Sequence, residues 1–126
     1  MSVASGGCSH AEGYYTAAHG NYSHAEGAST VALGDNSHAE GYNTLAFGVN
    51  SHAEGEGAIA KGLNQHVQGT YNIPIDDYQT IHIVGNGTSN ENRSNAHIIN
   101  DIGDAWFAGN VYVGSTSGTD WDDGCK

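Results

Sequence analysis

The residues best suited to chemistry in this sequence are histidines and glutamates that recur in pairs. The pentapeptide Ser-His-Ala-Glu-Gly begins at residues 9, 23, 37 and 51, and a degenerate copy, Gln-His-Val-Gln-Gly, begins at residue 65. Imidazole nitrogens and carboxylate oxygens are ligands for Zn²⁺ or Ni²⁺, and imidazole also titrates near neutral pH. The pairs are His10/Glu12, His24/Glu26, His38/Glu40 and His52/Glu54, followed by His66/Gln68.

A structural role fits these pairs better than a metal centre does. One outward pair repeated along a rod supplies neither a closed set of ligands nor a second layer of groups to orient them. We therefore predict no metal and no cofactor, with metal or ligand binding as the alternative. We expect a surface ladder whose histidines become charged near pH 6 and then pair with the glutamates.

The adjacent serine and histidine of each pentapeptide do not indicate a hydrolase. Neighbouring residues in a strand point to opposite faces, so a serine hydroxyl cannot meet the imidazole that follows it. Four copies of a supposed nucleophile also indicate repeated geometry rather than a catalytic centre. We predict no catalytic residues and no enzymatic activity.

The pairs belong to a finer repeat of seven residues, in which alanine is followed two positions later by glycine. A glycine in every unit would cost a helix about 1 kcal/mol relative to alanine, so the unit is strand and turn. Two halves form one coil of 14 residues, and a fixed period of this kind indicates stacked units. Successive coils should stack in parallel about 4.8 Å apart.

Each half-coil has a predicted interior residue and a predicted turn residue, because side chains alternate along a strand. The predicted interior residues are Ala11, Ala18, Ala25, Ala32, Ala39, Ala46, Ala53, Ala60 and Val67. The predicted turn glycines are Gly13, Gly20, Gly27, Gly34, Gly41, Gly48, Gly55 and Gly62. An interior made of methyl groups is too thin to stabilise a lone chain comfortably.

The outward positions of the second half-coils are apolar, unlike the His/Glu positions of the first. They form a predicted stripe of Val31, Leu33, Leu45, Phe47 and Ile59. A contiguous apolar patch is rare on the surface of a soluble monomer, so we expect it to pack against copies of the same chain. We predict a homotrimer with this stripe at its interface.

Composition excludes several other classes of partner. The chain has 126 residues, enough for one ordinary domain or two small ones, and a formal net charge of −11 from 14 acidic and 3 basic residues. That balance leaves no basic patch for nucleic acid or for an anionic membrane. No apolar run approaches the roughly 18 residues of a membrane span. We predict no nucleic-acid partner and no membrane partner.

The units at residues 31–34 (VALG), 36–41 (NSHAEG) and 43–48 (NTLAFG) resemble the head repeats of trimeric autotransporter adhesins of the YadA type. The resemblance covers residues 3–69 and implies a left-handed parallel β-roll that trimerises. The same repeat occurs in bacteriophage tail fibres and tailspike-like proteins. Residues 93–114 resemble a segment of phage tail-fibre proteins, which favours a virion tail fibre over a bacterial cell surface as the location.

The period stops after Gly69, and short strands are expected at residues 81–84, 96–99, 105–108 and 111–113, before a loose polar tail at 114–126. We predict a β-roll repeat domain over residues 1–71 and a C-terminal β-strand region over residues 72–126. The expected fold class is all-β: a left-handed parallel β-roll solenoid of 14-residue coils followed by a small antiparallel region, in a trimer.

The expected function is that of a structural and receptor-binding segment of a trimeric phage or prophage tail fibre, which mediates attachment to the host. Aromatic rings stack on sugars, and loops often carry function, so exposed tyrosines at turn tips are candidate contacts for a carbohydrate or protein receptor. These are Tyr14, Tyr15, Tyr22 and Tyr42. The alternatives are a bacterial surface adhesin head and a non-catalytic part of a polysaccharide depolymerase or self-cleaving tailspike.

Overall fold

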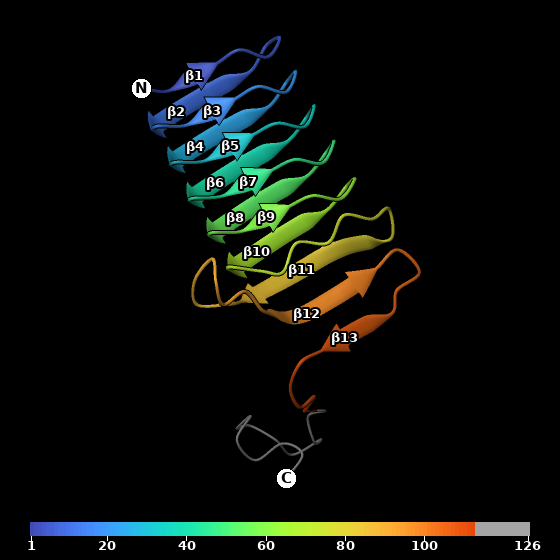
Figure 1. Ribbon diagram of the computed structural model, residues 1–126. Helices are drawn as coiled ribbons and strands as arrows, with labels where there is room; N and C mark the ends of the chain where they lie inside the picture. Colours follow the sequence, from blue (N-terminus) through green and yellow to red (C-terminus); the bar gives the residue numbers. More distant parts are fainter. Residues whose placement is uncertain (113–126) are drawn as a thin grey trace, which may run out of the picture.

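Two kinds of β-strand alternate along the chain in a computed structural model that describes residues 1–112. Strands of five residues alternate with strands of two residues, and Figure 1 shows them as a stack of coils. The long strands are β2 (His10–Tyr14), β4 (His24–Ala28), β6 (His38–Tyr42), β8 (His52–Glu56) and β10 (His66–Thr70). The short strands are β1 (Val3–Ala4), β3 (Ala17–Ala18), β5 (Val31–Ala32), β7 (Leu45–Ala46) and β9 (Ile59–Ala60).

The two kinds of strand form two parallel sheets. The short strands pair in the order β1-β3-β5-β7-β9, and the long strands pair in the order β2-β4-β6-β8-β10 within a larger sheet. Among these ten strands each paired residue lies opposite the residue 14 positions later, as His24 does with His38 and Val31 with Leu45. Equivalent residues therefore stack in columns, and the predicted parallel β-solenoid with a 14-residue period is confirmed. None of the described residues belongs to a helix with the length and hydropathy of a membrane span.

Small side chains fill the space between the sheets. The interior alanines from Ala18 to Ala60 have no exposed surface, and Val67 and Ile83 continue the column that the alanines of the long strands form. Ala11 is only half-buried, since β2 is the edge strand of its sheet. Beside the alanines lie buried hydroxyl side chains from the turns: Thr16, Thr30, Thr44, Ser23, Ser37 and Ser51.

The glycines have two roles rather than the single turn role that we predicted. Gly20, Gly34, Gly48 and Gly62 lie at bends, but Gly13, Gly27, Gly41 and Gly55 lie inside the long strands. These four have φ between 104° and 110°, and a Cβ on any of them would overlap the carbonyl oxygen of the glycine in the next coil. They are therefore required by the close approach of neighbouring coils.

Other residues make the turns after the long strands. Asn43, for example, has φ of 55°, and the equivalent Tyr15 and Ser29 have 54° and 58°. The strand β6 runs through Gly41 and Tyr42, both of which the sequence predicted to lie in turns. One left-handed residue is enough to redirect the chain, so the strand extends two residues further than predicted.

Parallel stacking continues beyond the last obvious repeat. Strand β11 (Thr80–Asn86) pairs in parallel with β10, with His66 opposite His82 and Val67 opposite Ile83. These positions are 16 residues apart (82 − 66), so an insertion hides the coil from a search for a fixed period. The expectation that the coils stop near Gly69 is wrong for this sheet.

The eight-stranded sheet ends with two antiparallel strands, β12 (Asn95–Asn100) and β13 (Ala105–Phe107). Three of the four predicted C-terminal strands are therefore present. Val111 and Tyr112 lie outside any strand, so a strand does not begin at residue 111. Val113 and the predicted polar tail lie outside the described residues.

Two buried side-chain amides close the short sheet, which ends at β9. The Asn72 side chain accepts a hydrogen bond from the Ile59 backbone N–H at 2.8 Å and donates to the Ile59 carbonyl at 3.0 Å. The Gln65 Oε1 accepts from the Lys61 N–H at 3.0 Å, and its amide nitrogen donates to the Ile75 and Thr80 carbonyls. These amides replace the backbone groups that a further strand would have supplied.

Candidate functional site

The histidines of successive coils form one continuous stack of rings along the long-stranded sheet. Ring centroids are 4.6–4.9 Å apart between neighbours in the run from His10 to His66. Beyond it the His82 ring is tilted by 38° on His66 at 5.4 Å, His97 meets His82 edge-on at 5.7 Å, and Phe107 stacks on His97 at 4.4 Å. We did not predict the last three rings, which come from β11, β12 and β13.

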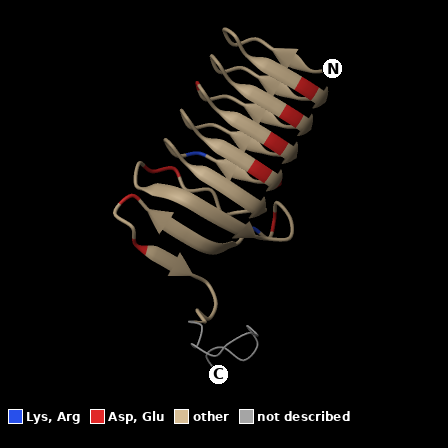
Figure 2. Ribbon diagram, turned by 180° about the vertical axis from the view of Figure 1, so that it is seen from behind, with Lys and Arg blue, Asp and Glu red and all other residues tan. Residues whose placement is uncertain are grey.

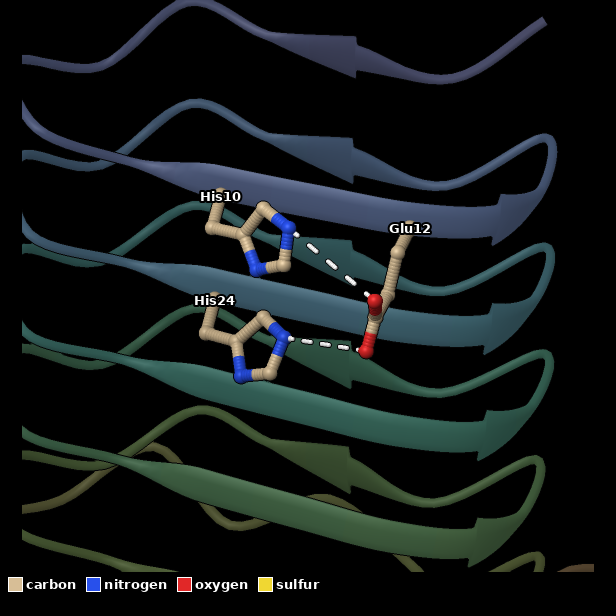
Figure 3. A group of neighbouring side chains, drawn as sticks. All are labelled: His10, Glu12 and His24. Carbon is tan, nitrogen blue, oxygen red and sulfur yellow. Dashed lines mark ion pairs between the residues drawn. The ribbon is translucent and has the colours of Figure 1, made fainter.

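The four glutamates of the repeats each lie beside two stacked imidazoles, and Glu12, Glu26 and Glu54 are within 4.0 Å of the Nε2 atoms of both. Glu12 is 4.0 Å from the Nε2 atom of His10 and 3.8 Å from that of His24 (Figure 3). Further along, the Oε1 atom of Glu40 is 3.2 Å from His52 Nε2. The acidic residues form a column down four successive long strands (Figure 2). Parallel pairing of identical residues thus creates an alternating ladder of imidazoles and carboxylates.

Several ring nitrogens in this ladder are buried without a hydrogen-bond partner among the described residues. They are the Nε2 atoms of His24, His38, His66 and His97. A buried polar atom without a partner costs free energy, so native structures hold few of them. The Nε2 atoms of His24, His38 and His66 thus lie 3.4–3.8 Å from glutamate oxygens without forming a hydrogen bond to them.

Burial and the neighbouring rings make two histidines of this stack, His38 and His82, harder to protonate. Desolvation lowers the pKa of His38, and the proximity of His52 lowers it further, while Glu40 and Glu26 act in the opposite direction. Desolvation likewise lowers the pKa of His82, and His66 and His97 add to that effect. For Glu54, desolvation opposes ionisation but contacts with Glu40, His52 and His66 prevail, and its pKa is lowered.

We expect His38 to titrate below 6.5 in the folded protein, and stability to fall as the pH drops through that region. A base whose pKa is lower in the folded state binds more protons when unfolded. Acidification below 6.5 therefore favours unfolding, and the full effect is reached below the folded pKa. NMR titration of the His38 ring protons in the native chain and in urea measures both values. A native midpoint above the unfolded one would contradict this assignment.

The apolar residues of the second half-coils form a second surface feature. In the short-stranded sheet Val31, Leu45 and Ile59 lie in one register column, which Val3 and Ala17 extend. Leu33 and Phe47 lie on the same outward side of the coils and are 38% and 41% exposed. All five residues of the predicted stripe are thus partly accessible in the single chain. Exposed Val49 and Leu63 lie two residues beyond Phe47 and Lys61 and were not predicted.

The four tyrosines proposed as receptor contacts are all exposed. Tyr15 and Tyr22 occupy left-handed turn positions, as expected. Tyr14 and Tyr42 instead end the strands β2 and β6, with Ala28 between them in the same column. Their placement at turn tips was wrong, because the long strands continue through the glycine that precedes them.

The serines next to the ladder histidines lie on the other side of the sheet. Ser23 is buried and its hydroxyl donates a hydrogen bond of 2.6 Å to the Gly20 carbonyl. Ser37 and Ser51 are equally buried, while the rings that follow them stack outside the roll. A serine–histidine pair therefore does not form within these pentapeptides.

The two sheets, the register of 14 residues and the columns of identical side chains define a parallel β-solenoid of short repeats. Two copies of the YadA head domain repeat match the chain, at residues 11–37 and 39–64. These residues are therefore YadA-type head repeats. No curated protein and no solved structure is significantly similar to the chain.

Proposed function

We propose that this chain is a rigid, homotrimeric segment of an attachment fibre that associates through its apolar stripe. The observation that carries the proposal is the partly exposed stripe of Val31, Leu33, Leu45, Phe47 and Ile59 above an interior made of alanine. A thin interior supplies little stabilising burial to a single chain, whereas packing three stripes together removes more apolar surface from water. Trimerisation would thus complete the hydrophobic core.

The proposed role of the fibre is attachment to a cell-surface receptor, carbohydrate or protein, without enzymatic activity. The stacked coils form a stiff support, and Tyr14, Tyr15, Tyr22 and Tyr42 present exposed aromatic rings at the side of it. Such rings suit contacts with sugars and with protein surfaces. We infer no nucleic-acid partner and no membrane partner from the strongly acidic composition.

The family match favours a bacterial surface adhesin head as the carrier of this segment, because the matched repeat is the YadA head. A virion tail fibre is the second candidate, and it depends on the resemblance of residues 93–114 to tail-fibre sequences. Both carriers give the segment the same task. The sequences that flank it in the full-length protein distinguish them: a stalk and membrane anchor support the adhesin, and a C-terminal chaperone supports the tail fibre.

The substitution Phe47→Asp is expected to convert the trimer to a monomer or an aggregate. It places a charge in the proposed interface, where desolvation without a partner is costly. Phe47 is 41% exposed in the single chain, so the fold of the roll should tolerate the change. Light scattering of the purified protein gives the mass directly.

Tyr42→Asp is the matched control, because Tyr42 is similarly exposed but lies on the other sheet. This variant should keep the mass of three chains. A wild-type protein with the mass of one chain, or equal masses for wild type and Phe47→Asp, would refute the proposed interface.

A further inference from the structure

We propose that the histidine–glutamate ladder is a binding site for divalent transition-metal ions, Zn²⁺ in particular, at triads of two stacked histidines and the glutamate between them. This inference does not depend on the proposed trimer. The four triads are His10/Glu12/His24, His24/Glu26/His38, His38/Glu40/His52 and His52/Glu54/His66. The triads include the histidines of all four Ser-His-Ala-Glu-Gly pentapeptides and His66 of the degenerate copy.

The geometry of a triad is close to that of a three-ligand metal site. In each one a ligand atom from every residue lies within 4.8 Å of the others. Bond lengths of about 2.0–2.2 Å in a tetrahedral zinc site separate its ligand atoms by about 3.4 Å. Seven of the eight histidine–glutamate contacts in the four triads already hold Nε2 and a carboxylate oxygen 3.2–4.0 Å apart, the exception being His38 and Glu40. The two imidazoles of a triad must rotate out of their nearly parallel stack so that both Nε2 lone pairs point at one ion, and water would supply the fourth ligand.

In the sequence, a single outward His/Glu pair supplies too few ligands for a metal ion. In the structure a third ligand is present, because parallel stacking places the histidine of the next coil beside the same glutamate. Glu26, for example, lies next to both His24 and His38. The buried Nε2 atoms of these two histidines have no hydrogen-bond partner in the described part of the chain. A metal ion would satisfy them.

Electrostatics also favour a cation at this place. The chain has a formal net charge of −11, and four of its six glutamates line the ladder. Neutral imidazole and ionised carboxylate are the forms that bind a metal, and both are the ordinary forms of these side chains above pH 7. The exposed His19 lies outside the stack and hydrogen-bonds Ser5 at 2.6 Å, so it serves as a reference.

Neighbouring triads share a histidine, and this sharing fixes the stoichiometry. The second triad shares His24 with the first and His38 with the third, and the third shares His52 with the fourth. An imidazole Nε2 binds one ion at a time, so two adjacent triads cannot be filled together. The ladder should therefore bind two ions per chain.

Three histidine-to-phenylalanine variants test this stoichiometry without removing a ring from the stack. Phe107 stacks on His97 in the same sheet, so a phenylalanine ring can take the place of an imidazole as a stacking partner without offering a ligand. Titration of the purified protein with ZnCl₂ at pH 7.5, followed by calorimetry, should give two ions per chain for wild type. We expect two for His38→Phe, which leaves the first and fourth triads, and one for His24→Phe. The double variant His24→Phe/His52→Phe breaks all four triads and should bind none.

Circular dichroism of each variant checks that the roll is intact, and His19→Phe should bind as wild type does. The inference is overturned by a wild-type chain that binds no zinc. It is equally overturned by a folded double variant that retains zinc, or by stoichiometries that do not follow the order two, two, one and none.

Discussion

Replacing Gly41 with alanine is expected to destabilise the roll by about 3 kcal/mol. Gly41 has φ of 105°, which is strained for any residue with a Cβ. The added methyl group would also overlap the carbonyl oxygen of Gly55 in the next coil. The backbone cannot move away without breaking the hydrogen bonds between β6 and β8. Urea unfolding at a fixed chain concentration measures the loss.

Two other glycines separate the two causes of this loss. Gly103 has φ of 91° with no atom near the position of its Cβ, so Gly103→Ala tests the backbone strain alone. Gly34 has no positive φ, but its Cβ would overlap the Gly48 carbonyl, so Gly34→Ala tests the steric overlap alone. We expect each to cost less than Gly41→Ala. A Gly41→Ala variant as stable as wild type would mean that the coils are not in this close register.

The substitution Ala39→Leu is expected to destabilise the roll by about 1–3 kcal/mol. Ala39 has no exposed surface and lies in the middle of β6, with Ala25 and Ala53 directly beside it in the column. A larger side chain must push the two sheets apart, because the interior has no spare volume. Urea unfolding again gives the magnitude.

The control for this variant is Ala28→Leu, the same chemical change at an outward position. Ala28 ends β4 between Tyr14 and Tyr42, whose large side chains are accommodated in the same column. We expect little or no loss of stability there. Equal effects at Ala28 and Ala39 would show that leucine acts through strand propensity and not through the interior.

The column arrangement follows from the sequence, because every element in it repeats. The period of 14 residues fixes the coil, and the alternation along His24-Ala25-Glu26 fixes which side chain points inward. The same two facts predicted the ring column and the apolar stripe. A repeated pattern is informative because one assignment, once made, applies to every coil.

The features that sequence reasoning missed do not repeat, or depend on contacts between coils. The insertion of two residues before His82 conceals its place in the ring stack, and His97 enters that stack from an antiparallel strand. The strand position of Gly41 depends on the carbonyl of Gly55, which is visible only after the coils are stacked. The Asn72 amide that closes the short sheet looks like an ordinary loop residue in the sequence.

The fixed register between coils determines how such a chain can change its length. Deleting or duplicating a whole 14-residue unit returns every residue to an equivalent column and shifts only the extent of the rod, by about 4.8 Å per unit. A change of one residue would turn the methyl groups outward and the imidazoles inward for the rest of a strand. The length of the rod can therefore change only by whole coils, while the Asn72 and Gln65 amides that close the short sheet keep their places.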